Sequence, residues 1–125
     1  MLAALNPEAE FHAVDFHPAH IAHGRALARA AGIDNLTFHE LSFADLATER
    51  APPMPMFDYV SMHGVWSWIA PDLQAAILRF LDRGLTAGGL VHVSFNALPG
   101  WTDVAPVQRL TKELAAASPV VATRR

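Results

Sequence analysis

The chain of 125 residues contains no cysteine, which excludes disulfide bonds, thiolate nucleophiles and thiolate metal sites. Charged residues make up only 17% of the chain, and the net charge of −3 gives no reason to expect a nucleic acid partner. No apolar run approaches the about 18 residues that a membrane span requires. The first residues, MLAALNPEAE, lack the basic region and long apolar core of a secretory signal. We therefore expect a cytoplasmic protein that binds neither nucleic acid nor membrane.

Apolar residues are abundant, at 52% of the chain, as in globular proteins. A chain of this length fits one domain that buries roughly two-thirds of its unfolded surface. We therefore treat residues 1–125 as a single domain, and we expect the last residues, 118–125, to form a frayed tail.

Short apolar segments alternate with helical patterns along the chain. Strands are expected over 10–16, 36–41, 57–62 and 90–95, and helices over 18–31, 71–83 and about 103–117, with a short helix after the second strand, a loop over 47–55 and a turn at Gly88-Gly89. Such alternation predicts an α/β fold with a mostly parallel sheet of about four strands and helices on both faces.

Two of the expected helices carry an apolar face. In the helix over 71–83, five apolar side chains follow the i, i+3, i+4, i+7, i+8 pattern of one buried stripe: Leu73, Ala76, Ile77, Phe80 and Leu81. The helix over 18–31 begins at a proline and is followed by Gly32, a residue that favours the left-handed helix stop. Its apolar face is made of small residues, which would let it lie close to a sheet.

The stretch HAVDFHPAHIAHG, residues 12–24, places three histidines three residues apart behind Asp15. A metal site is one interpretation, and a strand that turns into a helix is the other. Steps of three along a helix spread the three imidazoles over roughly 120°, no HExxH pattern is present, and no acidic residue is paired with them. We favour a solvated helix start and no metal, which leaves Asp15 as the informative residue.

Three segments carry a resemblance to a known family. They are FHAVDFHPAHIAHGRALARAAGIDNLTF, FDYVSMHGVWSWI and LTAGGLVHVSFNALPGW, and together they cover about residues 8–102. With these segments the chain resembles a class I S-adenosylmethionine-dependent methyltransferase, of the bacterial subgroup in which a methyltransferase domain precedes a regulatory domain. The resemblance implies a partial Rossmann-like fold and S-adenosylmethionine as the cofactor.

The resemblance also implies roles for individual residues. Asp15, at a strand end, would accept hydrogen bonds from the cofactor ribose, since a carboxylate offers the two acceptor oxygens that a vicinal diol needs. Ser42 and Phe43 would edge the adenine, with Asp45 as a substitute acceptor one turn further on. The residues implied to bind the cofactor are Asp15, Phe16, Ser42, Phe43, His63, Gly64 and Val65, and those implied to face the substrate are Trp66, Asn96 and Trp101. His63 is the one catalytic candidate, as a base for an amine acceptor.

The chain departs from the family pattern at both ends. The family's first strand and its glycine-rich loop would precede residue 1, and its last two strands would follow the chain. The first strand normally lies between the strands at 10–16 and 57–62, so its absence would leave a gap roughly 10 Å wide. Either those two strands pair directly or another chain fills the gap, and we therefore expect a homo-oligomer or a strand-donating partner.

Three functions follow from these observations. The first is methyl transfer from S-adenosylmethionine to an unidentified acceptor, for which the resemblance makes a protein side chain one choice. The second is a non-catalytic binding or assembly module derived from a methyltransferase, because the chain lacks the glycine-rich cofactor loop. The third is a nicotinamide-binding Rossmann fragment, which Asp15 alone favours.

Overall fold

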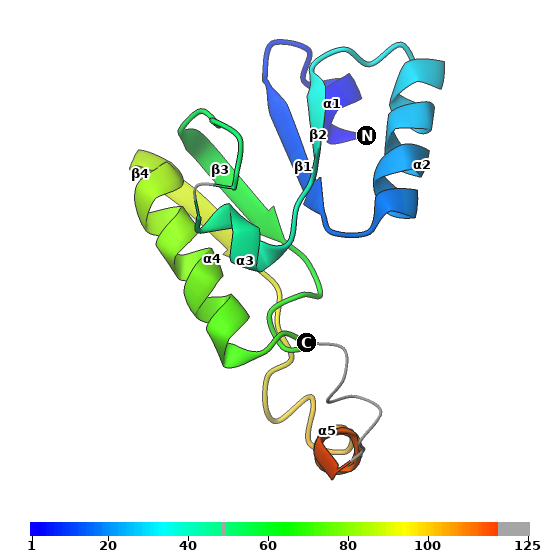
Figure 1. Ribbon diagram of the computed structural model, residues 1–125, viewed down its shortest axis with the longest axis vertical. Helices are drawn as coiled ribbons and strands as arrows, with labels where there is room; N and C mark the ends of the chain where they lie inside the picture. Colours follow the sequence, from blue (N-terminus) through cyan, green and yellow to red (C-terminus); the bar gives the residue numbers. More distant parts are fainter. Residues whose placement is uncertain (49, 118–125) are drawn as a thin grey trace. The chain divides into compact units, whose positions relative to one another are not determined.

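The computed structural model describes residues 1–48 and 50–117, so the expected tail at 118–125 lies outside the described residues. Figure 1 shows the order of the elements along the chain. They are α1 (Leu2–Leu5), β1 (Phe11–Asp15), α2 (Pro18–Ala30), β2 (Leu36–Glu40), α3 (Phe43–Leu46), β3 (Phe57–Met62), α4 (Pro71–Gly84), β4 (Leu85–Val93) and α5 (Ala105–Ala117).

The chain divides into two compact units. The first unit comprises Met1–Val60 and Ile69–Val91, and the second comprises Ser61–Trp68 and His92–Arg125. The division falls within β3 and β4, so the carboxyl ends of these two strands and the loops that follow them belong to the second unit. No helix in the described ranges is long and apolar enough to cross a membrane.

In the first unit, β1 and β2 form a parallel pair that α2 packs against (Figure 1). The face of α2 toward the pair carries the buried residues Ile21 and Ala28. Gly24 lies on the same face, and a Cβ atom at this position would stand 2.5 Å from Cε1 of the Phe38 ring in β2. The predicted close approach of this helix to a sheet is confirmed, and so is Gly32 as its left-handed stop, with φ 65°.

The side chain of Asn35 ties the beginning of the chain to the loop before β2. Its Nδ2 lies 3.1 Å from the carbonyl oxygen of Ala3, 3.0 Å from that of Asn6 and 2.9 Å from that of Ala9. The two hydrogens of this amide are shared among three carbonyl oxygens at the end of α1 and in the turn after it, and the oxygens of Ala3 and Asn6 also accept a backbone N–H.

Helix α4 packs on α3 in the first unit and buries the stripe that its periodicity predicts. Ala76, Ile77 and Leu81 are buried, and the ring of Phe80 lies 6.1 Å from the ring of Phe57 in β3. Pro71 is tolerated at the first turn of α4, because a backbone N–H at this position would have no hydrogen-bond acceptor within the helix.

The prediction of a turn at Gly88-Gly89 is wrong. Both glycines lie inside β4, which begins at Leu85 directly after α4. The backbone at Gly88 has φ 86°, a conformation that glycine adopts without the strain of a Cβ atom. A glycine pair inside a strand marks an irregular strand backbone as readily as a turn, and the sequence alone does not separate the two.

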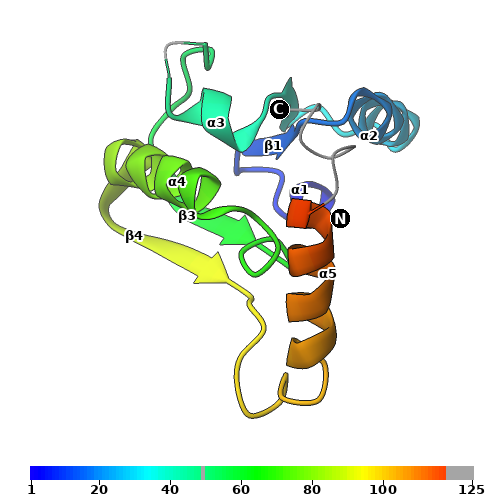
Figure 2. The same ribbon diagram turned by 60° about the horizontal axis from the view of Figure 1, so that its bottom comes forward.

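The expected α/β class, with parallel strands and helices, is confirmed, but the four strands form two separate pairs, β1–β2 and β3–β4, where a single sheet was expected. Figure 2 shows β3 and β4 side by side with their arrowheads pointing the same way. No strand among the described residues joins β1 to β3, although the His12 ring of β1 meets the Phe57 ring of β3 edge-on at 5.3 Å.

Candidate cofactor and substrate site

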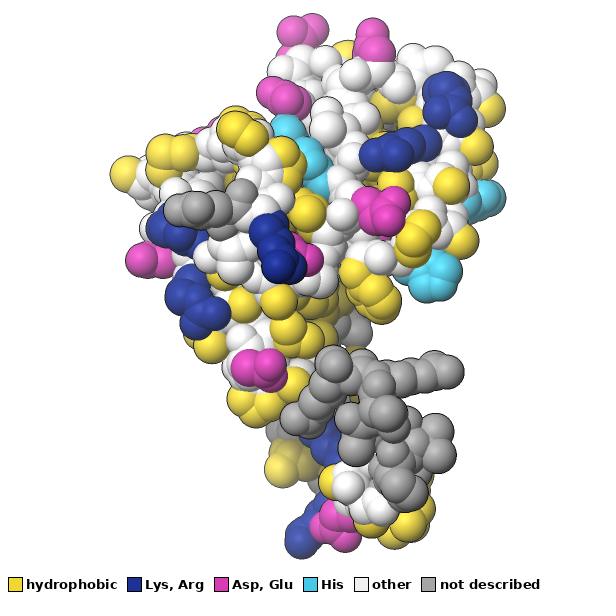
Figure 3. All heavy atoms as spheres, in the orientation of Figure 1, with side chains coloured by type: hydrophobic (Ala, Val, Ile, Leu, Met, Phe, Trp, Pro, Cys, Tyr) yellow, Lys and Arg dark blue, Asp and Glu magenta, His cyan; other side chains and the backbone are white. Residues whose placement is uncertain are grey.

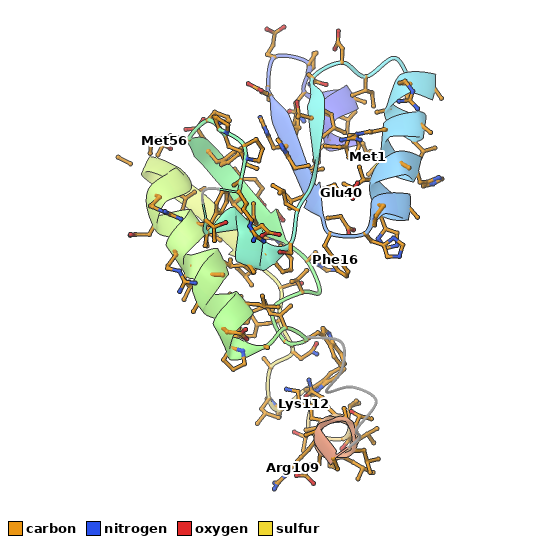
Figure 4. All side chains as sticks on the ribbon, viewed as in Figure 1. Met1, Phe16, Glu40, Met56, Arg109 and Lys112 are labelled. Atoms are coloured by element: carbon orange, nitrogen blue, oxygen red, sulfur yellow. The ribbon has the colours of Figure 1, made fainter. Side chains whose placement is uncertain are left out.

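Strands β1 and β2 end at the same edge of their sheet. Asp15 stands opposite Glu40 in the ladder, and the amide of Leu41 donates to the Asp15 carbonyl oxygen at 3.1 Å. Phe16, in the turn after β1, and Glu40, at the end of β2, both lie at this edge in Figure 4, and Phe16 is largely exposed. In open parallel sheets this is the edge at which ligands bind.

The Asp15 carboxylate is held by two donors from its own turn and from α2. The backbone N–H of His17 donates to Oδ1 at 2.8 Å, and Nδ1 of His20 lies 3.0 Å from Oδ2. The hydrogen bond from the His17 amide, followed by that from His20, holds the pKa of Asp15 below its ordinary value. The side chain is 38% exposed, so an ionised carboxylate faces solvent at the strand end.

The histidines at the start of α2 are arranged around this carboxylate. His17 is the N-cap residue, and its Nδ1 accepts the amide of Ala19 at 3.2 Å. The rings of His17 and His20 stack with centroids 4.4 Å apart. Figure 3 shows histidine side chains on the surface at this end of α2. The expectation that no acid pairs with these histidines is wrong, because the turn before the helix brings the Asp15 carboxylate to His20.

Metal binding has no further support within residues 1–48 and 50–117, where no group of three or more metal-ligating side chains gathers.

Ser42 and Phe43 begin the short helix α3 after β2. Ser42 is the N-cap: its Oγ accepts the Asp45 amide at 3.2 Å and donates to Asp45 Oδ2 at 2.7 Å. Arg50 Nη1 lies 3.4 Å from the other carboxylate oxygen. The Ser42 hydroxyl, followed by Arg50, lowers the pKa of Asp45. The Ser42 and Asp45 side chains therefore cap the N-terminus of α3. The Asp45 carboxylate oxygens keep lone pairs that could accept from a further donor.

In the second unit, the loops after β3 and β4 are hydrogen-bonded to each other. The Ser94 amide donates to the Met62 carbonyl oxygen at 3.0 Å, and Ser94 Oγ accepts the Gly64 amide at 2.8 Å. Further along, Ser67 Oγ accepts the Asn96 amide at 2.7 Å. The two segments implied to bind the methionine part of the cofactor and the acceptor thus lie side by side.

Aromatic side chains flank these loops. Trp68 and Trp101 meet edge-to-face with ring centroids 6.0 Å apart, and Trp101 Nε1 donates to Gln108 of α5 at 3.3 Å. Gln108 in turn donates to the Ser67 carbonyl oxygen at 3.3 Å. Trp66 is half-buried. These contacts give α5 a definite place in the second unit.

Two polar side chains of this unit stand out. Nδ2 of Asn96 is buried without a hydrogen-bond partner in the described ranges. An unpaired buried amide donor is unfavourable unless a further group accepts from it. His63 is exposed, and no hydrogen bond or ion pair holds its imidazole among the residues that the structure describes. Gly64 is exposed as well, and Val65 is half-buried.

Sequence reasoning missed three residues that the structure places at these positions: His20, Ser94 and Gln108. The contact of His20 with Asp15 could have been predicted from the sequence, since a residue in the first turn of a helix is close to an acid in the turn just before it. The contacts of Ser94 and Gln108 could not have been predicted, because their partners lie about 30 to 40 residues away in the sequence.

Comparison with known proteins assigns the class. Residues 1–91 match the family described as "Methyltransferase domain", so the chain belongs to this methyltransferase family. An uncharacterized protein of Synechocystis sp. is 40% identical over 110 residues, which are 88% of this chain and 21% of that protein. An uncharacterized protein of Rickettsia prowazekii is 33% identical over 106 residues, which are 85% of this chain and 18% of that protein.

Two solved structures are similar to this chain. PKMT2 from Rickettsia typhi, in complex with AdoHcy, is 31% identical with a TM-score of 0.69 over 90% of this chain and 20% of that chain. A second structure of PKMT2 from Rickettsia typhi has a TM-score of 0.71 and 29% identity over 90% of this chain and 21% of that chain. The chain therefore spans about a fifth of the length of these proteins.

Proposed function

We propose that the chain binds S-adenosylmethionine and takes part in methyl transfer to an acceptor. The observation that carries the proposal is the ionised, exposed Asp15 carboxylate at the end of β1, in a chain of the methyltransferase family. The AdoHcy complex of a 31% identical protein supports the choice of cofactor. The cofactor supplies a methyl group on a sulfonium, which is transferred as the carbon–sulfur bond breaks and the bond to the acceptor forms.

The hydrogen bonds that the Asp15 carboxylate already accepts leave acceptor positions for a ribose. An ionised carboxylate only accepts hydrogen bonds, with about two lone-pair positions on each oxygen. His17 and His20 each take one position, so each oxygen keeps one for a ribose hydroxyl. In this assignment Phe16, Ser42 and Phe43 flank the nucleoside from the same edge of the first unit.

The loops after β3 and β4 carry the residues proposed for the methionine part of the cofactor and for the acceptor. His63, Gly64 and Val65 follow β3, where we place the methionine part of the cofactor. Trp66, Asn96 and Trp101 would face the acceptor. Their role is chiefly to align the two reactants, because methyl transfer from a sulfonium needs position more than acid–base chemistry.

A protein side-chain amine is the acceptor class we propose. An amine attacks only after it has lost its proton, and His63 is the group that would take this proton. The buried Asn96 Nδ2, which lacks a partner in the described ranges, would gain one from a carbonyl oxygen of a peptide acceptor.

We also propose that the chain associates, with a second copy or with a strand-donating partner. Strand β1 pairs only with β2 and β3 only with β4 within the described residues, so each keeps one edge of unpaired backbone groups. Several large apolar side chains are more than half exposed: Leu27, Tyr59, Leu90, Phe95, Leu98 and Leu110. Exposed apolar surface of this kind favours association.

Titration with S-adenosylhomocysteine of the unaltered chain, Asp15→Ala and Asp34→Ala tests the proposal. Asp34 is an exposed acid in the loop before β2 and serves as the matched control. We expect saturable binding by the unaltered chain and by Asp34→Ala, and binding at least tenfold weaker for Asp15→Ala, since a charge-assisted hydrogen bond is worth about 1.5–3 kcal/mol. Equal affinity of Asp15→Ala and the unaltered chain would remove the ribose assignment. A folded chain that binds nothing would favour the non-catalytic module, and a preference for NAD would favour the nicotinamide-binding alternative.

A further inference from the structure

We propose that His20 is a positioning residue for the cofactor ribose: by donating from Nδ1 to Asp15 Oδ2, it orients the carboxylate so that both oxygens present a free acceptor position to the vicinal diol. The inference rests on the proposed function, because it concerns the same carboxylate. It adds a residue outside the cofactor-binding set inferred above.

The geometry gives each carboxylate oxygen a different anchor. Oδ1 is held at 2.8 Å by the His17 amide, which belongs to the turn that Asp15 itself begins. Oδ2 is held at 3.0 Å by His20, one turn into α2. With Oδ1 alone anchored, the carboxylate could still rotate and carry Oδ2 through a range of positions. The contact with His20 removes this freedom before the ligand arrives, which is the ordinary route by which preorganisation improves affinity.

The surroundings of His20 favour this role over a structural one. Its side chain is 67% exposed, so its removal opens no cavity in the core. His17 stacks on its ring, but the Nδ1 of His17 already accepts the Ala19 amide, which leaves His20 as the imidazole that meets Asp15. The other ionisable groups nearby are Glu40, opposite Asp15 at the end of β2, and His23, one turn further along α2.

The test compares ligands that differ only in the diol. The affinity of the full chain is measured by calorimetry for S-adenosylhomocysteine and for its 2′,3′-dideoxy analogue, with circular dichroism to verify the fold. His20→Ala is expected to bind S-adenosylhomocysteine roughly three- to tenfold more weakly, which corresponds to the loss of one immobilised contact. Its affinity for the dideoxy analogue is expected to stay within about twofold, because that ligand does not use the carboxylate's two free positions.

Two conservative variants examine the donor itself. Asparagine carries its Nδ2 at the same bond distance from the backbone as the Nδ1 of histidine, so His20→Asn is expected to restore the affinity. Glutamine carries its amide one carbon further out, so His20→Gln is expected to restore less. His23→Ala is the matched control, and we expect it to change neither ligand's affinity.

The outcomes separate this inference from the proposed function. If Asp15→Ala loses affinity while His20→Ala keeps it, or if His20→Ala weakens both ligands equally, the positioning role is wrong and the function stands. If His20→Asn does not restore the affinity, hydrogen-bond donation from position 20 to Asp15 Oδ2 is not what improves binding. If the unaltered chain does not bind, the proposed function fails and the inference with it. If Asp15→Ala binds as well as the unaltered chain, the ribose assignment fails and the inference with it, while cofactor binding stands.

Discussion

At the scale of residues, two hydrogen bonds at a strand-to-helix turn lower the pKa of the Asp15 carboxyl group. The backbone amide of His17 is the larger cause of its lowered pKa and His20 the second. We therefore predict that His20→Ala raises the pKa of Asp15 only part of the way to its ordinary value. A carbon-13 NMR titration of the Asp15 carboxyl carbon measures this. A full return to the ordinary value would mean that the His17 amide contributes nothing.

A second residue-scale prediction concerns the imidazole pair between β1 and β2. His12 Nδ1 lies 2.8 Å from His39 Nε2, and His12 Nε2 lies 3.0 Å from Glu10. Burial, followed by the nearby charges of His12 and Arg25, lowers the pKa of His39. Because the folded-state pKa lies below the unfolded value of about 6.5, its contribution to stability is present above that value and lost as the pH falls through the folded pKa.

We expect His39→Gln to reduce the loss of stability on acidification. Urea denaturation at pH 7.5 and at pH 5.5 measures the free energy of unfolding of the unaltered chain and the variant. His23→Gln, on the exposed side of α2, is the control and is expected to keep the full acid dependence. The same acid dependence in His39→Gln would contradict the assignment.

Residues differ in how far they could be predicted from the sequence. The place of Asp15 was predictable, because an acid that ends a strand and precedes a proline-initiated helix must lie at a carboxyl edge. The engaged hydroxyl of Ser42 was not recognised, although a serine three residues before Asp45 is a capping pattern. The Asn96 side-chain Nδ2, buried without a partner among the residues that the structure describes, was not predictable, since its loop is held by Ser67, about 30 residues away in the sequence.

At the scale of elements, the close packing of α2 on β2 makes a definite prediction. A methyl group at Gly24 would stand 2.5 Å from the Phe38 ring, so Gly24→Ala is expected to destabilise the chain. Overpacking costs about 1–3 kcal/mol, and the better helix propensity of alanine returns about 1 kcal/mol of this. Gly84→Ala is the control, because its methyl would lie 3.6 Å from the Phe80 ring, an ordinary contact. Urea denaturation compares the two, and a Gly24→Ala variant that is stabilised as much as Gly84→Ala would show that α2 does not approach β2 this closely.

A pair of substitutions tests which face of α4 is packed. Ile77 is 3% exposed, whereas its neighbour Leu78 is 56% exposed. We expect Ile77→Ala to lower the free energy of unfolding by about 2–5 kcal/mol and Leu78→Ala to change it by less than about 0.5 kcal/mol. Chemical denaturation of both variants measures the difference. Equal effects would mean that the stripe is not the packed face of this helix.

The elements also show where sequence reasoning ends. The bounds of α2 and α4 were predicted to within a residue, because their periodicity, prolines and following glycines are local signals. The start of β4 was predicted five residues too late, because the Gly88-Gly89 pair is compatible with a turn or with an irregular strand. The separation of β1–β2 from β3–β4 was not predicted, since strand pairing depends on residues far apart in the sequence.

At the scale of the whole molecule, the central question is whether this chain binds the cofactor of its family. This chain spans only about a fifth of the Synechocystis relative and of the solved structure with AdoHcy, so the activities of those proteins remain proposals for this chain. Within residues 1–48 and 50–117, β1 and β3 each keep one edge without a paired strand, which makes association part of the same question. Affinity and molecular mass therefore have to be measured on the same sample.

The most direct measurement is a calorimetric titration of the purified chain with S-adenosylhomocysteine, with the mass followed by light scattering. We predict saturable binding at micromolar ligand, by a chain whose mass is a multiple of the 13.6 kDa of a single copy or that of a complex with a strand-donating partner. A folded chain that releases no heat at millimolar ligand would contradict the proposed function and indicate a methyltransferase-derived module without cofactor. Binding by a single copy would retain the function and remove the proposed association.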